Sequence, residues 1–352
     1  MALLKPVIGI TVGDVNGIGV EVILKTFLDT RIFDFCTPVI YGNAKLLSNN
    51  RKAMNLPAFN FNLVKEDFKL SFNAINVVNI WEEELLPAYG TTNPGWGKYA
   101  FMSIEAAMKD YTAGKIQAIV TAPINKQTIH SETFPFKGHT EYFTQQFPNA
   151  ESVMMMVGEN LRVCMATHHI ALGDVKATLT TDLLTKKINL IKNSLIKDFG
   201  IDAPRVAVLG LNPHAGDNGL MGDEEEKIIL PAIKTARDKG LLIFGPYPAD
   251  GFFGAKTYKN FDCVLAMYHD QGLIPFKAIE FSSGVNFTAG IPLVRTSPDH
   301  GTAFDIAGKG IADESSFREA VFLAVDIYRS RINYAEMTSN PIVRKVIQKE
   351  RY

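Results

Sequence analysis

The 352-residue chain is long for a single small core, so we expect two lobes. Its 47% hydrophobic and 21% charged residues are typical of a globular protein and argue against a disordered one. The net charge is −1, and the sequence lacks the kind of lysine and arginine cluster that would predict binding to nucleic acid or to a membrane surface. No stretch approaches the roughly 18 apolar residues of a membrane span, and Lys5, Pro6 and Gly9 interrupt any signal-peptide core.

The chain contains three cysteines, Cys36, Cys164 and Cys263, and each lies in or beside an apolar stretch. They form no C-x-x-C pair, which argues against a zinc–thiolate site. Buried free thiols suit a reducing compartment, so we expect a cytoplasmic protein.

Strand and helix patterns alternate along the chain, which predicts an α/β fold with a parallel sheet. Expected strands lie at residues 6–12, 38–41, 74–80, 118–121 and 153–157. One expected helix follows the first strand and ends near residue 28. Further helices are expected at residues 44–54, 93–108, 182–197, 224–239 and 316–332. The helix at 93 would have Asn93 as its cap and Pro94 at its first position. No linker-like stretch marks a boundary, so the chain is expected to cross between the lobes and return.

Three apolar runs that end in histidine are the most informative feature of the sequence. They span residues 161–169, 205–214 and 263–269, and a turn signal follows each one. In a parallel sheet, functional groups collect beyond the carboxyl ends of the strands. Three imidazoles there could hold a divalent metal and leave positions open for a substrate. His168 and His169 compete for this role, because neighbours on a strand face opposite ways and spacing does not choose between them.

A glycine-containing turn, residues 13–21, lies between the first strand and the first helix, where backbone N–H groups could face an anion. It is not the G-x-G-x-x-G pattern, and no acidic residue follows at the end of a second strand. An ordinary Rossmann cofactor site is therefore not expected, and a tight structural turn is the alternative.

Two further segments are candidates for binding an anion. Residues 138–141 read as a helix start, where His139 and Thr140 could donate to a phosphate or carboxylate. A simple threonine cap explains the same pattern. Arg295 follows an apolar run and could act with the next two hydroxyl residues as an anion clamp.

Lys277 and His300 are also candidates. Lys277 follows the apolar residues 273–276, where a lysine is costly unless it is paired or used, although an exposed lysine is the simpler explanation. Residues 299–303 are expected to open a helix, at which His300 binds a nucleotide or only caps the turn.

In these segments the chain closely resembles the 4-hydroxythreonine-4-phosphate dehydrogenase family of pyridoxal-phosphate biosynthesis. The matching segments run in order along nearly the whole chain: GHTE at 138–141, VMMMV at 153–157, LNPHAG at 211–216, AMYHDQG at 266–272, GVN at 284–286 and RTSPDHGTA at 295–303. The resemblance implies a two-lobed α/β/α sandwich like that of isocitrate and isopropylmalate dehydrogenases, with the active site in the cleft. One lobe, on the cofactor side, would hold residues 1–130 and 285–352. The other, on the metal and dimer side, would hold residues 131–284.

The resemblance also implies residue roles. The metal ligands would be His169, His214 and His269, the last supplied by the partner subunit of an obligate homodimer. The substrate would contact His139, Thr140, Lys277, Asn286 and Arg295. The NAD turn would comprise His300, Gly301 and Thr302. Asp250 would lie near the substrate.

The implied reaction is NAD-dependent oxidative decarboxylation of 4-phosphooxy-L-threonine to 3-amino-2-oxopropyl phosphate and CO2. Lys277 would handle a proton or neutralise charge, and Asp250 would orient polar groups. Zinc is the first choice of metal, with cobalt, nickel, manganese or magnesium as alternatives. Relatives of this family act on 4-phosphothreonate or 4-phosphoerythronate. A metal-dependent hydrolase of phosphorylated acids would use three histidines equally well, and an inactive sugar-phosphate sensor is a third hypothesis.

The first turn departs from the family pattern. That pattern often reads P-G-E-P-A-G-I-G-P-E, whereas this chain reads VGDVNGIGVE at residues 12–21. The glycines and Glu21 remain, but the turn prolines are absent, which leaves the rigidity of the turn and the substrate preference open.

Overall fold

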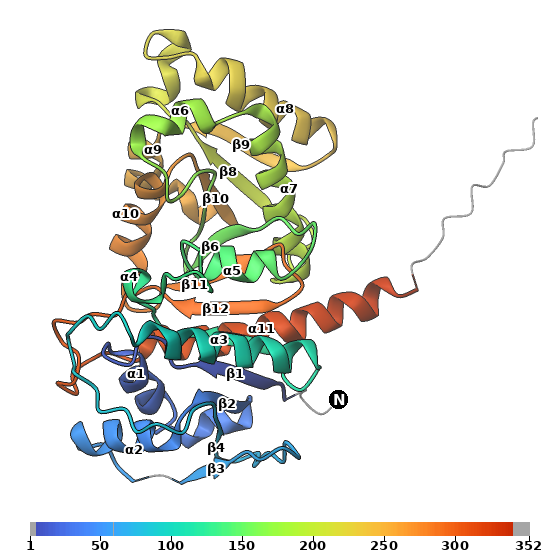
Figure 1. The fold of residues 1–352 in the computed structure, drawn as a ribbon. Helices are drawn as coiled ribbons and strands as arrows, with labels where there is room; N and C mark the ends of the chain where they lie inside the picture. Colours follow the sequence, from blue (N-terminus) through green and yellow to red (C-terminus); the bar gives the residue numbers. More distant parts are fainter. Residues whose placement is uncertain (1–4, 59, 341–352) are drawn as a thin grey trace, which may run out of the picture.

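The computed structural model describes residues 5–340 except residue 59. Its strands form one twelve-stranded sheet in the order β3-β4-β2-β1-β5-β12-β11-β6-β7-β10-β8-β9, and helices cover both faces of the sheet (Figure 1). The α/β class predicted from the sequence is confirmed. Within the described residues, no helix combines the length and apolar character needed to cross a membrane.

The elements alternate along most of the chain. The strands are β1 Val7–Thr11, β2 Thr37–Gly42, β3 Phe61–Leu63, β4 Ile75–Asn79, β5 Ala118–Thr121, β6 Val153–Val157, β7 Arg162–Met165, β8 Arg205–Leu209, β9 Leu242–Tyr247, β10 Cys263–Ala266, β11 Val285–Ala289 and β12 Val294–Pro298. The α-helices are α1 Gly19–Thr26, α2 Ala44–Ala53, α3 Gly97–Thr112, α4 Lys126–Ile129, α5 His139–Gln145, α6 Val175–Thr178, α7 Thr181–Lys197, α8 Leu230–Asp238, α9 Ala249–Gly254, α10 His269–Glu280 and α11 Ser315–Thr338.

The sheet is mixed, so the prediction of a parallel sheet is wrong at its centre. β11 runs antiparallel to both β6 and β12, and β6 runs antiparallel to β7. The links β6–β7 and β11–β12 are only residues 158–161 and 290–293. Such short links permit antiparallel pairing and exclude the crossover that a parallel pair needs. The strands on the two sides of this central group are paired in parallel.

The chain crosses from one part of the sheet to the other and returns. Strands β1–β5 occupy one side, β6–β10 the other, and β11 and β12 come back to the middle of the order (Figure 1). The sheet is continuous through the join. The division into lobes at residues 131 and 285 stays a prediction.

Two helix predictions are wrong in their starting points. The Oδ1 atom of Asn93 accepts a hydrogen bond from the Gly95 N–H at 3.1 Å, which closes a turn, and α3 begins four residues later at Gly97. Residues 299–303 open no helix, because turns and bends continue until α11 begins at Ser315. In both places a local hydrogen bond or turn competes with the helix that the sequence pattern suggests.

β11 separates two environments by simple alternation. Val285, Phe287 and Ala289 face the core beneath α7 and α11, and Phe287 is fully buried. The intervening Asn286 and Thr288 face the other side. The central strands therefore carry polar side chains on one face without weakening the apolar core on the other.

Helix α11 is anchored by apolar side chains such as Phe317, which is fully buried. Replacing Phe317 with Ala should lower the free energy of unfolding by about 3–5 kcal/mol, because it leaves a cavity in the core. The matched change Phe72→Ala, at a side chain that is 63% exposed, should cost less than about 0.5 kcal/mol. Chemical denaturation of the two variants compares the effects, and equal losses would contradict the assigned packing.

Candidate functional site

A cavity of about 220 Å³ lies over the central strands, on the face to which Asn286 points. It gathers most of the residues predicted to bind substrate and cofactor. Its lining includes His139, Thr140, His169, Asn286, Arg295, His300 and Gly301. These residues are far apart in sequence, so the cavity is a product of the fold.

Arg295 dominates the charge of this cavity. Its side chain on β12 is only 2% exposed and has no carboxylate within ion-pair distance in the described residues. Its guanidinium donates to the hydroxyl oxygens of Thr121 at 2.6 Å and Thr288 at 3.3 Å, and its Nε has no partner. Burial lowers the pKa of Arg295 to about 9, so the group stays charged at neutral pH. Arg295 forms no ion pair in the described residues, and the Glu141 carboxylate offsets its charge only from a greater distance, so the site favours an anionic ligand.

His139 and Lys126 line the cavity beside Arg295. His139 begins α5 and its ring stacks on Phe143, with centroids 6.3 Å apart. Burial, followed by the positive charges of Arg295 and Lys126, holds the pKa of His139 well below its usual range. The ring is therefore neutral, and its buried Nε2 lacks a partner. A neutral imidazole between two cations is suited to hydrogen bonding with a bound anion.

The opposite wall contains His300. Its Nδ1 lies 3.0 Å from the Gly301 carbonyl oxygen, which assigns the proton to Nδ1 and leaves Nε2 as an acceptor. Burial lowers the pKa of His300, and its Nε2 is another buried atom without a partner. Lys277 on α10 lies nearby, with its Nζ 3.2 Å from the Asp299 carbonyl oxygen and 3.5 Å from the Asp299 carboxylate. The cation is thus held next to the His300 turn.

Two of the three predicted metal ligands lie close together in one subunit. The rings of His169 and His269 are 6.3 Å apart and line a neighbouring cavity of about 400 Å³. The Nδ1 of His169 lies 3.4 Å from Oε1 of Glu141, and this contact contributes most to lowering the pKa of Glu141 to about 2. Ligand atoms of Glu141, His168 and His169 all fall within 4.8 Å of one another. Imidazole and carboxylate groups at such spacing fit a divalent cation.

His214 and Asp250 lie elsewhere. Neither residue lines the two cavities just described, and both are exposed. His269 does lie beside His169 of its own chain, so His214 is the predicted ligand left outside. The full set of three histidines stays a prediction, as does the role of Asp250.

The predicted cofactor turn packs against the first glycine turn. The Ile18 N–H donates to the Thr302 carbonyl oxygen at 3.0 Å, and a Cβ at Gly17 would approach that oxygen to 2.8 Å. Gly17 is therefore required by close contact. Asn16, 1% exposed, donates its side-chain amide to the Thr91 carbonyl and accepts from the Ala88 N–H, which ties the turn to residues 88–91.

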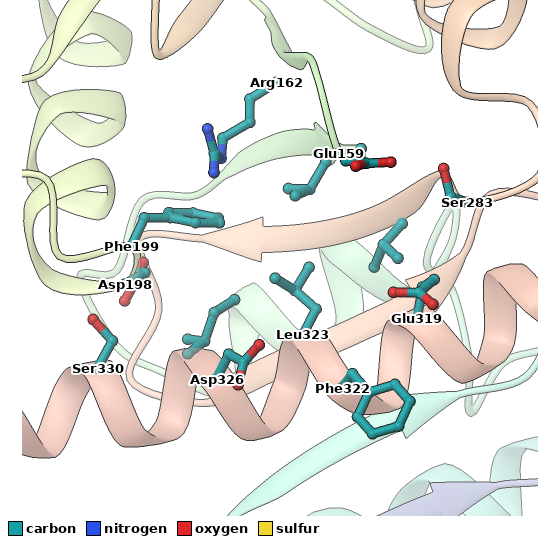
Figure 2. Close-up of a pocket in the computed structure, with 14 residues that line it drawn as sticks. Glu159, Arg162, Asp198, Phe199, Ser283, Glu319, Phe322, Leu323, Asp326 and Ser330 are labelled. Carbon is teal, nitrogen blue, oxygen red and sulfur yellow. The ribbon is translucent and has the colours of Figure 1, made fainter.

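A larger cavity of about 510 Å³ lies on the other face of the sheet, between α11, the end of α7 and the β6–β7 turn (Figure 2). Arg162 stacks on Phe199 in its wall, 4.7 Å from the ring centroid. None of the residues predicted from the sequence to be functional lines this cavity. Size alone therefore does not mark the candidate site.

Comparison with known proteins agrees with this geometry. Residues 34–324 match the family described as pyridoxal phosphate biosynthetic protein PdxA. The chain belongs to this family.

Individual PdxA relatives are similar over nearly their whole length. The 4-hydroxythreonine-4-phosphate dehydrogenase of Bacteroides thetaiotaomicron is 48% identical over 343 residues, covering 97% of this chain and 94% of the relative. A protein of Oceanobacillus iheyensis named for D-threonate 4-phosphate dehydrogenase activity is 39% identical over 327 residues, covering 92% and 98%. The crystal structure of 4-hydroxythreonine-4-phosphate dehydrogenase from Klebsiella pneumoniae superimposes with a TM-score of 0.81 at 36% identity, covering 93% of this chain and 99% of that one.

The sequence patterns missed two residues that the PdxA fold brings to the cavity. Lys126 follows the turn after β5, and Glu141 is the last residue of the helix start that the sequence predicts at 138–141. A lysine just beyond the end of a buried strand was the available signal for Lys126. The contact of Glu141 with His169 joins segments 28 residues apart, and no local pattern encodes it.

Replacing Arg295 with Met removes the buried charge and keeps a side chain that fits an apolar site. The ligand-free protein should unfold at an equal or higher temperature, with a gain of about 1 kcal/mol, because an unpaired buried charge is lost. Inorganic phosphate should no longer raise the unfolding temperature of this variant. Arg318→Met, which removes a half-buried partner of Glu314, is the control and should retain the phosphate effect. Phosphate stabilisation of Arg295→Met equal to that of the parent would contradict the anion site.

Proposed function

We propose that this protein is an NAD- and divalent-metal-dependent dehydrogenase that oxidises and decarboxylates 4-phosphooxy-L-threonine to 3-amino-2-oxopropyl phosphate and CO2. The observation that carries the proposal is the buried guanidinium of Arg295, which forms no ion pair in the described residues. It lies in a cavity where His139, Asn286 and His300 each present a buried polar atom without a partner. The phosphate and carboxylate groups of the substrate would supply negative charge to Arg295, and its hydroxyl and amino groups would donate to acceptors such as Nε2 of His300 and Oδ1 of Asn286. The names of the relatives support the same reaction.

The residues present fit both groups that the reaction needs. His169 and His269, with His214, would hold the cation, and the turn from His300 to Thr302 would contact the nucleotide. When bound, a divalent cation lowers the pKa of the substrate hydroxyl, and NAD accepts a hydride from the carbon that bears it. The soft nitrogen donors favour zinc, cobalt or nickel over magnesium.

The remaining residues bind and orient the substrate. Arg295 and Lys126 would neutralise its anionic groups through charge-assisted hydrogen bonds, which are stronger than neutral ones. His139 is neutral and stacked on Phe143, so it offers a fixed hydrogen-bonding atom and adds no charge. Lys277, held beside Asp299, is the candidate for delivering a proton as CO2 leaves.

The substrate itself has a second candidate. A relative covering 98% of its own length is named for D-threonate 4-phosphate, which shares the phosphate, hydroxyl and carboxylate groups with 4-phosphooxy-L-threonine but has no amino group. The cavity contains no carboxylate placed to select the amino group except Glu141, which contacts His169. The choice between the two substrates therefore depends on measurement.

The reaction should form NADH and CO2 in equal amounts from NAD and 4-phosphooxy-L-threonine. A panel that adds 4-phospho-D-threonate and 4-phospho-D-erythronate, followed by NADH absorbance, identifies the preferred substrate. Release of inorganic phosphate without NADH would instead indicate a metal-dependent hydrolase.

Arg295→Ala should lose at least about 2 kcal/mol of transition-state binding, measured from kcat/KM, because a charge-assisted contact is removed.

We also propose that two subunits of a homodimer share each site. Support comes from His214 and Asp250, which lie outside the cavities of their own chain. Exposed apolar side chains near the histidines offer contact area, since Leu172 is 72% and Ile274 66% exposed. Leu273 and Phe276, in the same helix as Ile274, offer no contact area, because both are buried in the core of their own chain.

Mixing two inactive variants tests this arrangement. His169→Ala and His214→Ala should each be inactive alone, and joint unfolding and refolding should restore activity, because one site of each mixed dimer is then intact. Mixed dimers are verified by mass, and each variant refolded alone is the control. A mixture that stays inactive although mixed dimers have formed would place all ligands in one subunit.

A further inference from the structure

His214 belongs to an unusual turn. Within the segment Pro213–Gly219, six successive residues have positive φ: His214 at 54°, Ala215 at 52°, Gly216 at 82°, Asp217 at 44°, Asn218 at 51° and Gly219 at 89°. Four of the six carry a Cβ, for which this left-handed conformation is unfavourable. Such a turn persists only where surrounding groups determine it.

Glu225 is the group that holds the start of this turn. Its side chain is buried, and its Oε1 accepts the backbone N–H groups of Leu211 at 2.7 Å and Asn212 at 2.8 Å. Its Oε2 accepts the Asn212 side-chain amide at 2.9 Å. The Glu225 carboxylate thus accepts three hydrogen bonds from Leu211 and Asn212, which precede His214 in the chain.

Glu224 completes the arrangement. Its Oε2 accepts the same Asn212 amide at 2.7 Å, and it forms an ion pair with Lys176. The hydrogen bonds from Lys176 and Asn212 lower the pKa of Glu224 to about 2, so it is ionised at neutral pH. Two adjacent carboxylates face the same turn because a five-residue π-helix, Glu225–Ile229, starts here, a form often found at functional positions.

Two glycines lie in close contact with these carboxylates. A Cβ at Gly216 would lie 2.7 Å from Oε2 of Glu225, and one at Gly222 would lie 2.6 Å from Oε2 of Glu224. Neither site has room for a side chain. A side chain at either glycine would therefore displace the carboxylate that it meets.

A second connection joins this turn to the other histidine segment. Gln271 on α10 donates its Nε2 to the Gly210 carbonyl oxygen at 2.7 Å, and its Oε1 accepts the Met267 N–H at 2.7 Å. One side chain thus fixes the segment that leads to His214 relative to the segment that leads to His269.

We propose that Glu225, supported by Glu224, is a positioning residue that orients His214 for binding a divalent cation. This inference rests on the proposed function, in which His214 is a metal ligand. Glu224 also pairs with Lys176, whereas the hydrogen bonds of the Glu225 carboxylate in the described residues go to Leu211 and Asn212. These hydrogen bonds fix the backbone just before the left-handed turn from which the His214 side chain extends.

Metal affinity of the metal-free dimer tests the proposal independently of turnover. Co²⁺ is titrated into the parent, Glu225→Gln and Glu226→Gln, and binding is followed by the visible absorption of Co²⁺ and by calorimetry. Glu225→Gln replaces an acceptor oxygen with an amide that opposes the Asn212 amide, so affinity should fall about tenfold or more. Glu226 is exposed and makes no side-chain hydrogen bond in the described structure, so Glu226→Gln should match the parent.

The same titrations in a His214→Ala background separate positioning from general destabilisation. If Glu225 acts through His214, Glu225→Gln should weaken Co²⁺ binding no further in that background. An additional loss of equal size there, or parent-like affinity of Glu225→Gln alone, overturns the inference. Parent-like affinity of His214→Ala would instead overturn the proposed ligand set. If circular dichroism shows that Glu225→Gln does not fold, Asn212→Ala takes its place, and parent-like Co²⁺ affinity of that variant then overturns the inference.

Discussion

The burial of one guanidinium constrains most of the candidate site. Arg295 lies in a central strand with only hydroxyl partners, and Phe143 covers it at 6.0 Å from the ring centroid. Burial, together with the charges of Arg295 and Lys126, lowers the pKa of His139 and keeps it neutral, and the charge of Arg295 favours an anion in the cavity. Burying this charge lowers the free energy of unfolding of the ligand-free protein. A bound anion offsets this loss, so ligand binding should stabilise the fold.

The antiparallel centre of the sheet brings the walls of the cavity together. β11 enters in the reverse direction, which places Thr288 directly opposite Arg295 and Asn286 opposite Ser297. The same strand pairs Thr288 with Met154 of β6, whose side chain also lines the cavity. A parallel strand at this place would need a long crossover and would not set these residues side by side.

Sequence patterns predicted much of the fold and part of the site, for identifiable reasons. Buried strands such as Val153–Val157 are continuous apolar runs, and short-range periodicity is enough to find them. Pairing direction is not local, so the reversal of β11 escaped prediction. His139, Arg295 and His300 were identified from local patterns and Asn286 through the family resemblance, and all four line one cavity. Glu141 and Glu225 were missed because their importance depends on contacts with distant segments.

The alternation along β11 and β12 has a consequence for how this protein can evolve. Each second residue faces the cavity, and its neighbours face the core, so substitutions such as those at Asn286 or Ser297 can alter ligand selection while the core stays intact. Deleting one residue from β11 has the opposite effect. It would turn Phe287 toward the cavity and Thr288 toward the core, exchanging the two faces at once. Specificity in this lineage should therefore diversify by point substitution, with strand length under strong purifying selection.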